Sequence, residues 1–373
     1  MAPRVLIFTA SIGAGHDLPA EVLAAALNER GASAEIVDGL EVGGPVARAV
    51  VASGSSLETT AGNLGFELAY FLGTRFVPMR RAGSGVIDIV LRRRTSAFLA
   101  GNPADVIVST YPITTELLGG MRAGGSLRTP VVSAITDLAA LNYWAHPGVD
   151  LHLVTHPESE PEVRSIAGPR TRIEAVHGLT DPRFLRPPDR DEARAELGVP
   201  LGRPLVVVSG GGWGVGDLRG ASDAALQSGA AKLIVLAGTN EKAKAQLELA
   251  YESEGRRVEI WGFTDRMPTL LAAANVLVHS TAGLTVLEAL RCGCRVISYG
   301  WHRGHIRVNN EAYERLGMAT VAKGRPALSK ALRHAIAAGP LPPKVPDLSA
   351  AADVVLGLAA AGEDDRRRSK HRA

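Results

Sequence analysis

Short apolar runs and amphipathic stretches alternate along the first part of the chain. Residues 4–10 (RVLIFTA) are a short apolar run followed by a glycine-containing turn, a pattern typical of a buried strand in a parallel sheet. Residues 18–30 have the spacing of an amphipathic helix that ends at Gly31, and residues 34–38 predict a second strand. The order strand, loop, helix, strand indicates an α/β domain with helices covering a parallel sheet.

The same pattern continues through the N-terminal half. It predicts further strands at residues 104–109, 130–135, 151–154 and 171–176. Between the second and third strands, residues 45–100 form a long, mostly helical stretch. This stretch carries a cluster of basic residues: Arg75, Arg80, Arg81, Arg92, Arg93 and Arg94.

A proline- and charge-rich segment at residues 181–191 is followed by a second strand–helix series. Its strands are predicted at residues 205–208, 232–237, 258–261, 276–278 and 295–298, with helices that include residues 241–254 and 285–292. The predicted fold class is therefore α/β, with two Rossmann-like domains that face each other across a cleft. The domains are placed at residues 1–180 and 201–340, joined by a linker at 181–200. Residues 341–373 are expected to form a C-terminal helix and a charged, disordered tail.

The composition bounds the classes of protein that the chain can belong to. Of its 373 residues, 46% are hydrophobic and 21% are charged, which is enough for two packed domains. The net charge is only +3, so charge gives no reason to expect a nucleic-acid partner. The two cysteines, Cys292 and Cys294, lie two apart in an apolar run, and this spacing indicates buried thiols rather than disulfides or a metal pair.

The N-terminal apolar run is interrupted by Gly13, Gly15 and His16, which is too early for a secretory signal. No stretch approaches the roughly 20 apolar residues that a membrane-spanning helix needs. We therefore expect a cytoplasmic protein that is at most peripheral on the inner face of the cell membrane.

A glycine-rich segment, residues 209–216 (SGGGWGVG), directly follows a predicted strand of the second half. Glycines let backbone N–H groups approach a phosphate or a sugar, so we expect ligand contacts here; the alternative is a tight strand-to-helix turn. The expected contacts are Gly211, Gly212, Trp213 and Gly214. The segment has no Gly-Lys-Ser/Thr of a Walker A motif, and the first turn, residues 11–16, lacks the GxGxxG spacing of a nicotinamide site.

Two further segments of the second half carry candidate binding chemistry. In residues 279–289 (HSTAGLTVLEA), small and hydroxyl residues precede a helix whose free N–H groups suit a diphosphate, and Glu288 lies about one turn further in. An ordinary capped helix with a solvated glutamate is the alternative. In residues 261–267 (WGFTDRM), an aromatic strand end can form the wall of a base pocket, or can belong to the core.

Together, in this order and in one domain, these three segments resemble the donor half of GT-B glycosyltransferases, and more specifically glycosyltransferase family 28. That family includes monogalactosyldiacylglycerol synthase, bacterial diacylglycerol glucosyltransferase and the MurG-type transferase of peptidoglycan synthesis. The resemblance implies that Glu288 binds the ribose and that the C-terminal domain binds a nucleotide sugar. It implies diphosphate contacts at Thr281, Ala282, Gly283, Leu284 and Thr285, and uracil contacts at Trp261, Gly262 and Phe263.

The N-terminal half resembles the galactolipid-synthase branch of the family. Residues 11–16 (SIGAGH) are similar to its S-x-G-G-G-H opening, and Thr136-Asp137-Leu138 with Trp144 is similar to its T-D-x…W segment. The resemblance covers roughly residues 4–335. It implies an acceptor-binding N-terminal domain with Gly13, Gly15 and Trp144 in the acceptor loop.

Two residues of these motifs are candidates for catalysis on the acceptor side, because a base must take the proton of the acceptor hydroxyl. His16 is the first, with a structural or capping histidine as the alternative. Asp137 is the second, as base or as the carboxylate that orients His16, with a helix N-cap as the alternative.

The chain departs from the family pattern at two places. The usual Lys-x-Gly-Gly before the diphosphate helix is replaced by residues 279–283 (HSTAG), which removes one countercharge. The usual P-G-Q-E-x-x-N is replaced by residues 303–309 (RGHIRVN), so His305 stands where glutamine binds the donor sugar and Asn309 keeps its place. Arg303 and Arg307 could restore charge near the phosphates.

The resemblance implies a metal-independent hexosyltransferase without a cofactor. Its donor would be a UDP-sugar or a related nucleotide-diphosphate sugar, and its acceptor a hydroxyl of a lipid such as diacylglycerol or a polyprenyl-linked molecule. The region from Arg75 to Arg94 could face an anionic membrane or be a solvated basic helix face. His146, His152 and His156 lack metal-ligand spacing and are interpreted as structural. The alternatives are a UDP-sugar 2-epimerase or hydrolase of the same fold and a non-catalytic nucleotide-binding protein.

Overall fold

The computed structural model describes residues 2–10, 14–45, 47–48, 85–280, 283–300 and 304–370, with the backbone alone for residues 14–16, 85–88 and 363–370. The chain divides into two compact units. The first unit consists of Met1–Asp181 together with Leu348–Ala373, and the second consists of Pro182–Asp347.

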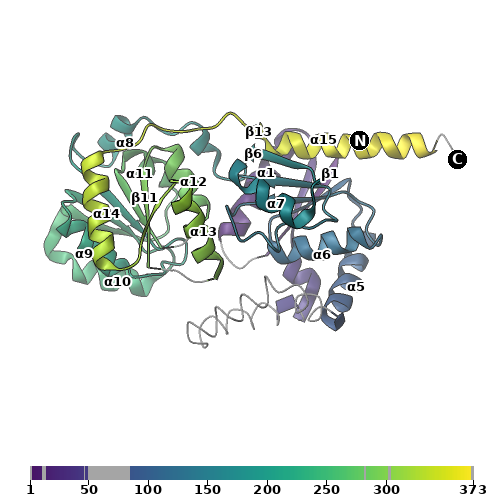
Figure 1. Cartoon of the computed structure of the whole chain (residues 1–373), viewed down its shortest axis with the longest axis horizontal. Coiled ribbons are helices and arrows are strands. Elements are labelled where there is room, and N and C mark those ends of the chain that lie inside the picture. Colours follow the sequence, from purple (N-terminus) through teal and green to yellow (C-terminus); the bar gives the residue numbers. More distant parts are fainter. Residues whose placement is uncertain are drawn as a thin grey trace. The chain divides into compact units, whose positions relative to one another are not determined.

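The first unit is built on a seven-stranded sheet in which every pairing is parallel, in the order β13-β6-β5-β4-β3-β1-β2 (Figure 1). Its strands are β1 (Arg4–Thr9), β2 (Ser33–Asp38), β3 (Val106–Ser109), β4 (Val131–Ile135), β5 (Leu151–Val154), β6 (Ile173–His177) and β13 (Ser349–Ala350). Its helices include α1 (Ala14–Glu29), α5 (Gly85–Gly101), α6 (Pro112–Ala123), the 3-10 turn η1 (Pro157–Ser159), α7 (Glu160–Ala167) and α15 (Ala351–Lys370).

Helices cover both faces of this sheet, as expected for its central strands β1, β3 and β4, which are buried along most of their length. On one face, side chains of α1 and α15 pack against strands β1, β3, β4 and β5 in one core that includes Leu23, Val108 and Val355. On the other face, α6 packs on β1 and β3, with Phe98 of α5 against Phe8. Helix α15 thus brings the end of the chain back to the first sheet, and Arg30 of the α1 end pairs with Asp353 at 2.6 Å.

The second unit has a six-stranded parallel sheet in the order β12-β11-β10-β7-β8-β9. Its strands are β7 (Leu205–Ser209), β8 (Lys232–Leu236), β9 (Val258–Trp261), β10 (Val276–His279), β11 (Arg295–Tyr299) and β12 (Thr320–Ala322). Its helices include η2 (Pro182–Leu185), α8 (Arg190–Glu196), α9 (Leu218–Gln227), α10 (Glu241–Ala250), η3 (Glu252–Arg257), α11 (Met267–Ala273), α12 (Leu284–Arg291), α13 (Gly304–Arg315) and α14 (Arg325–Ala338).

The strand order of the second sheet reverses between β7 and β10, as in a Rossmann fold. Helices α9, α10 and α14 share one core with all six strands of the sheet, and Figure 1 shows α11, α12 and α13 on its other face. The predicted fold class, α/β with two Rossmann-like domains, is confirmed.

Two details of the predicted organisation are wrong. The predicted linker, residues 181–200, is not a separate connection, because from Pro182 onward it belongs to the second unit and holds η2 and α8. The charged tail, predicted to be disordered, is helical as far as Lys370. Its acidic residues, Glu363 to Asp365, precede basic residues by three or four positions, a spacing that favours a helix.

Candidate functional site

The carboxyl edge of the second sheet gathers most of the predicted donor residues. Ser209 at the end of β7 and His279 at the end of β10 are register partners across the point where the strand order reverses. The loops that leave these two strands therefore start side by side. Ligands of open parallel sheets bind at this kind of position.

The glycine-rich loop after β7 is folded tightly against the turn between β8 and α10. The backbone N–H and the hydroxyl of Thr239 both donate to the carbonyl of Gly212, at 2.8 and 3.0 Å. Gly214 has a φ of +59°, and a Cβ there would lie 1.9 Å from the carbonyl oxygen of Ala237. Glycine is thus required at position 214 for the turn itself. Trp213, between these glycines, is 59% exposed and free to contact a ligand.

The segment that precedes α12 is fastened to the glycine-rich loop by Ser280. Its hydroxyl donates to the carbonyls of Val215 at 2.8 Å and Ser209 at 3.3 Å. A Cβ at Gly216 would lie 2.6 Å from the Cβ of Ser280, so the two segments are in direct contact. The sequence predicts both segments as ligand-binding, but it does not predict that Ser280 joins them.

Helix α12 begins at its N-cap, Gly283, which has a φ of +116° and offers no side-chain cap. The first N–H groups of a helix have no partner within the helix, so they suit an anion. Tyr313 of α13 donates to the carbonyl of Gly283 at 3.4 Å and helps hold it. Leu284 is buried and Thr285 is half-buried. Thr281 and Ala282, the other predicted diphosphate contacts, lie outside the described residues.

Glu288, predicted to bind ribose, lies one turn into α12 and is only 6% exposed. It is close to Arg291, which is 1% exposed. Burial lowers the pKa of Arg291, and the negative charge of Glu288 opposes that shift. Glu288 therefore has a structural partner in the unit, and its contact with ribose remains a prediction.

The aromatic residues after β9 differ in their surroundings. Trp261 is half-buried, donates through Nε1 to Glu259 at 3.0 Å and carries the Arg266 guanidinium 5.2 Å from its ring centre. Phe263 is 69% exposed. Gly262 packs near Gly238, so this loop adjoins the β8–α10 turn that supports the glycine-rich loop. Phe263 is therefore more available than Trp261 for contact with the uracil base of a nucleotide.

The two candidates on α13 have different environments. His305 is exposed, whereas Asn309 is fully buried and donates from Nδ2 to the carbonyl of His305 at 3.0 Å. Arg307 forms an ion pair with Glu311 at 3.0 Å, so part of the charge that it could offer a phosphate is already balanced. Arg303 lies outside the described residues.

In the first unit, the strand order reverses between β1 and β3. Gly15 and His16 lie in the first turn of α1, which follows β1; the side chain of His16 and all of Gly13 lie outside what the structure describes. The next residue, Asp17, accepts a hydrogen bond from the hydroxyl of Thr9 at 3.1 Å. His16 thus lies on a segment at the carboxyl edge, where a ligand of this sheet is expected.

Asp137 and Trp144, the other acceptor-side candidates, are in direct contact. Asp137 is half-buried, and its Oδ2 accepts a hydrogen bond from Nε1 of Trp144, which is 1% exposed, at 3.0 Å. The alternative interpretation of Asp137 as a helix N-cap is wrong, because the chain continues after it as a loop. In that loop Ala140 has a φ of +66°, a conformation that costs energy for a residue with a Cβ. Such strain is often found at functional loops.

Two of the three histidines interpreted as structural, His146 and His152, contact each other. His152 is fully buried, accepts a hydrogen bond at Nε2 from the N–H of His146 at 3.3 Å and contacts the hydroxyl of Thr171 at 3.1 Å. Burial lowers the pKa of His152 to about 4, so the ring is neutral at pH 7. Within the described residues, no group of three or more His, Cys, Asp or Glu side chains could hold a metal ion.

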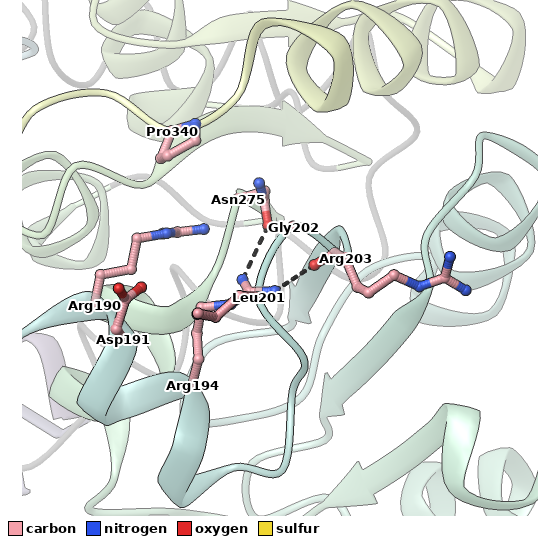
Figure 2. Close-up of a pocket in the computed structure, with 8 residues that line it drawn as sticks. All are labelled: Arg190, Asp191, Arg194, Leu201, Gly202, Arg203, Asn275 and Pro340. Carbon is pink, nitrogen blue, oxygen red and sulfur yellow. Dashed lines mark hydrogen bonds between the residues drawn. The ribbon is translucent and has the colours of Figure 1, made fainter.

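A cavity of about 310 Å³ lies at the amino edge of the second sheet, opposite the edge that holds the predicted donor residues. Figure 2 shows Arg190 and Arg194 beside it, with the Arg203 side chain pointing away. Arg190 and Arg194 donate to the carbonyls of Ala272, Ala273 and Ala274 at the end of α11, at 2.8–2.9 Å. The two arginines therefore cap a helix terminus, and we do not assign the cavity to the donor.

Both halves of the chain match family models of glycosyltransferases. Residues 16–179 match the family model for monogalactosyldiacylglycerol (MGDG) synthase, and residues 221–337 match the model for glycosyl transferases group 1. The chain is a glycosyltransferase. A processive diacylglycerol beta-glucosyltransferase of Bacillus thuringiensis is 22% identical over 323 residues, which cover 86% of this chain and 82% of the relative. The corresponding enzyme of Bacillus cytotoxicus is 23% identical over the same length.

Solved structures support the fold. UGT89C1 of Arabidopsis thaliana, complexed with quercetin, has a TM-score of 0.55 at 14% identity and covers 90% of each chain. MurG of Acinetobacter baumannii has a TM-score of 0.54 at 13% identity, covering 91% of this glycosyltransferase and 96% of MurG. Os79 of O. sativa, in complex with UDP, has a TM-score of 0.57 at 15% identity, covering 89% and 90%. The glycosyltransferase therefore has the GT-B fold.

Proposed function

We propose that the protein transfers a hexosyl group from a UDP-sugar to the hydroxyl group of a membrane lipid such as diacylglycerol. The observation that carries the proposal is the match of residues 16–179 to the MGDG synthase model, because the N-terminal domain would bind the acceptor. The similarity to diacylglycerol glucosyltransferases over 86% of the chain supports the same acceptor class. A polyprenyl-linked acceptor is the nearest alternative lipid.

The donor would bind at the carboxyl edge of the second sheet. The diphosphate would lie at the N-terminus of α12, where the free N–H groups after Gly283 stabilise negative charge as the sugar leaves. The glycine-rich loop, with Gly211, Gly212, Trp213 and Gly214, would contact the diphosphate or the sugar, and Phe263 the base. His305, exposed at the start of α13, would contact the sugar hydroxyls.

The acceptor hydroxyl would be activated in the first unit. His16, in the first turn of α1, would accept its proton, and Asp137 would orient that histidine or act as the base itself. Charge stabilisation by the helix terminus needs no metal ion, so we propose a metal-independent reaction without a cofactor.

A lipid acceptor would require the transfer reaction to take place at a membrane surface. None of the described helices is both long and apolar enough to cross a bilayer. We propose that the protein is cytoplasmic and binds the inner face of the cell membrane peripherally, through the basic region that includes Arg80, Arg81 and Arg92–Arg94. Residues 75–84 of the region from Arg75 to Arg94 lie outside the described residues.

A thermal-shift comparison of UDP, GDP and dTDP tests the donor assignment, because a ligand that binds only the folded state raises the Tm. UDP should raise the Tm, and the other two diphosphates should raise it less. Equal responses to all three would contradict a uracil pocket. No response to any of them would contradict nucleotide-sugar binding altogether.

A further inference from the structure

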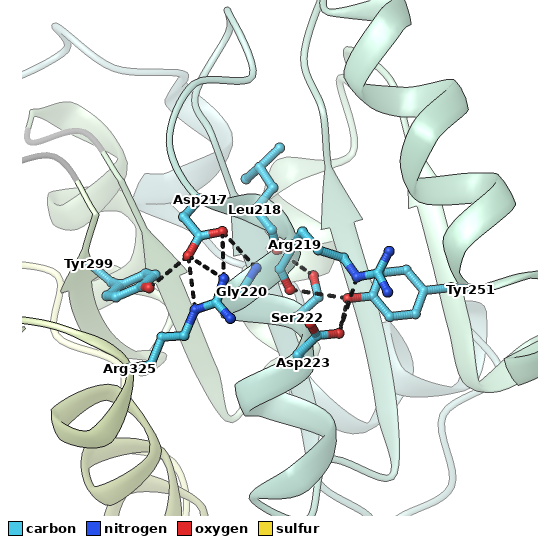
Figure 3. A network of polar contacts seen from close by, with 9 residues as sticks. All are labelled: Asp217, Leu218, Arg219, Gly220, Ser222, Asp223, Tyr251, Tyr299 and Arg325. Atoms are coloured by element: carbon cyan, nitrogen blue, oxygen red, sulfur yellow. Dashed lines mark hydrogen bonds and ion pairs between the residues drawn. The ribbon is translucent and has the colours of Figure 1, made fainter.

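One carboxylate joins three elements at the donor edge of the second sheet. Asp217, the N-cap of α9, directly follows the glycine-rich loop (Figure 3). Its Oδ1 accepts the N–H of Gly220 at 2.8 Å, and its Oδ2 accepts the hydroxyl of Tyr299 at 2.8 Å. The guanidinium of Arg325 approaches Oδ2 at 3.2 Å.

These partners come from parts of the chain that are remote in sequence. Tyr299 is the last residue of β11 and only 7% exposed, and Arg325 is the first residue of α14. A Cβ at Gly300 would lie 3.6 Å from the backbone nitrogen of Asp217. The contacts therefore fix the exit of the glycine-rich loop against the end of β11, the strand that precedes α13 and His305.

The segment that precedes α12 meets the glycine-rich loop and the end of β11 at the same place. A small cavity at this edge is lined by residues that include Ser209, Asp217, Ser280 and Tyr299. Ser280 binds the glycine-rich loop through the carbonyl of Val215 and leads toward α12. Asp217 thus lies where the loop, the start of the diphosphate helix and the end of β11 converge.

The charge of Asp217 is maintained by these contacts. Burial raises its pKa, but the hydrogen bonds from Gly220, Tyr299 and Arg325 outweigh burial, and the net pKa lies below its ordinary value. The carboxylate is therefore ionised at pH 7 and accepts from all three partners at once.

We propose that Asp217 is a positioning residue for the donor, which sets the glycine-rich loop in register with the end of β11 through the hydroxyl of Tyr299. The inference rests on the proposed binding of a UDP-sugar at this edge. Backbone N–H groups contribute to binding only when they are held within a few tenths of an ångström of their target. Hydrogen bonds from Thr239 and Ser280 hold the middle of the loop, and Asp217 adds a contact at its exit. A glycine-rich loop needs such contacts because glycine itself restricts the backbone least.

The same helix carries a matched control. Tyr251 donates its hydroxyl to Asp223 of α9 at 2.6 Å and is 7% exposed, the same fraction as Tyr299 (Figure 3). The Tyr251 hydroxyl donates to Asp223 and to the carbonyl of Arg219, both on α9 beyond the glycine-rich loop. Each tyrosine-to-phenylalanine change removes one buried hydroxyl and leaves one carboxylate oxygen without that donor.

The experiment compares Tyr299→Phe with Tyr251→Phe by Tm and by calorimetric titration with UDP and with UDP-glucose. Both variants should lose similar stability, since each loses one hydroxyl-to-carboxylate hydrogen bond. Tyr299→Phe should weaken the binding of both ligands roughly five- to tenfold, and Tyr251→Phe should leave it unchanged. If Tyr299→Phe does not fold, Asp217→Asn replaces it, because asparagine keeps the N-cap but has one acceptor oxygen fewer.

Equal ligand affinities in the two tyrosine variants, with the wild-type protein binding UDP normally, would overturn the positioning role and leave the proposed function intact. Weak binding by both variants would also overturn it, because the effect would then follow general stability. A wild-type protein that binds neither UDP nor UDP-glucose would contradict the proposed function itself, and with it the role of Asp217.

Discussion

The indole nitrogen of Trp144 donates a hydrogen bond to Oδ2 of Asp137 at 3.0 Å. Trp144 is buried in a core with Ile135 and Val154, so its position is fixed by packing on β4 and β5. The carboxylate is therefore held in one orientation just beyond the carboxyl end of β4. This arrangement gives a physical reason for the two residues to occur together in the acceptor-side motif.

Asp137→Asn should lower kcat for sugar transfer by about 100-fold or more, the usual contribution of a general base or its orienting group. The asparagine oxygen can still accept from Trp144, so the fold and the affinity for UDP should remain at the wild-type level. Steady-state kinetics and UDP titration measure the two quantities. A variant with wild-type kcat would remove Asp137 from the catalytic residues.

Glu288→Gln should weaken UDP binding by roughly tenfold, because the amide replaces a charged acceptor of ribose hydroxyls. It should also lower the Tm, since Arg291 loses the charge that offsets its burial. The control is Glu254→Gln, which breaks an ion pair with Arg257 in the same unit. A lower Tm with unchanged UDP affinity would show that Glu288 supports α12 and does not bind ribose.

Two buried histidines predict acid sensitivity. Burial lowers the pKa of His152 and of His279 from 6.5 to about 4. As the pH falls, these histidines are therefore protonated in the unfolded chain before they are protonated in the folded protein. The contribution of each neutral histidine to the free energy of unfolding is complete above pH 6.5 and is lost as the pH falls toward 4. The loss is up to about 3 kcal/mol for each histidine.

His152→Gln should therefore be less stable than the wild type at pH 7 but should lose less Tm between pH 7 and pH 4. The exposed His334 provides the control, and His334→Gln should follow the wild-type curve. Parallel curves for His152→Gln and the wild type would contradict the assignment of this acid sensitivity to His152.

Gly214→Ala tests whether the glycine-rich loop depends on close packing. The new Cβ would lie 1.9 Å from the carbonyl of Ala237, whereas at Gly255, which has a similar φ of +54°, a Cβ would meet nothing within 4 Å. Gly255→Ala should cost only the backbone strain, roughly 1–2 kcal/mol, and Gly214→Ala should cost more and abolish UDP binding. Equal Tm losses in the two variants would mean that the loop can move away from Ala237.

The sequence predicts most strands of both sheets, because they are short apolar runs, often of branched residues, between turns. It misses β12 and β13, which have only three and two residues and are too short to give such a run. It also identifies the segments at the donor edge, since they follow strand ends. It does not predict which sheet α15 covers: an amphipathic pattern indicates a buried face but not its partner. Nor does it predict the contact of Asp217 with Tyr299, 82 positions away, because only the parallel sheet brings these two strand ends together.

Lipid glycosylation can be measured by product analysis after incubation of the protein with radiolabelled UDP-glucose or UDP-galactose and vesicles containing diacylglycerol. A labelled glycolipid should appear in the organic phase only when diacylglycerol is present, together with release of UDP. Free sugar or an epimerised nucleotide sugar, formed equally without any lipid, would contradict lipid glycosylation and identify a hydrolase or epimerase of the same fold.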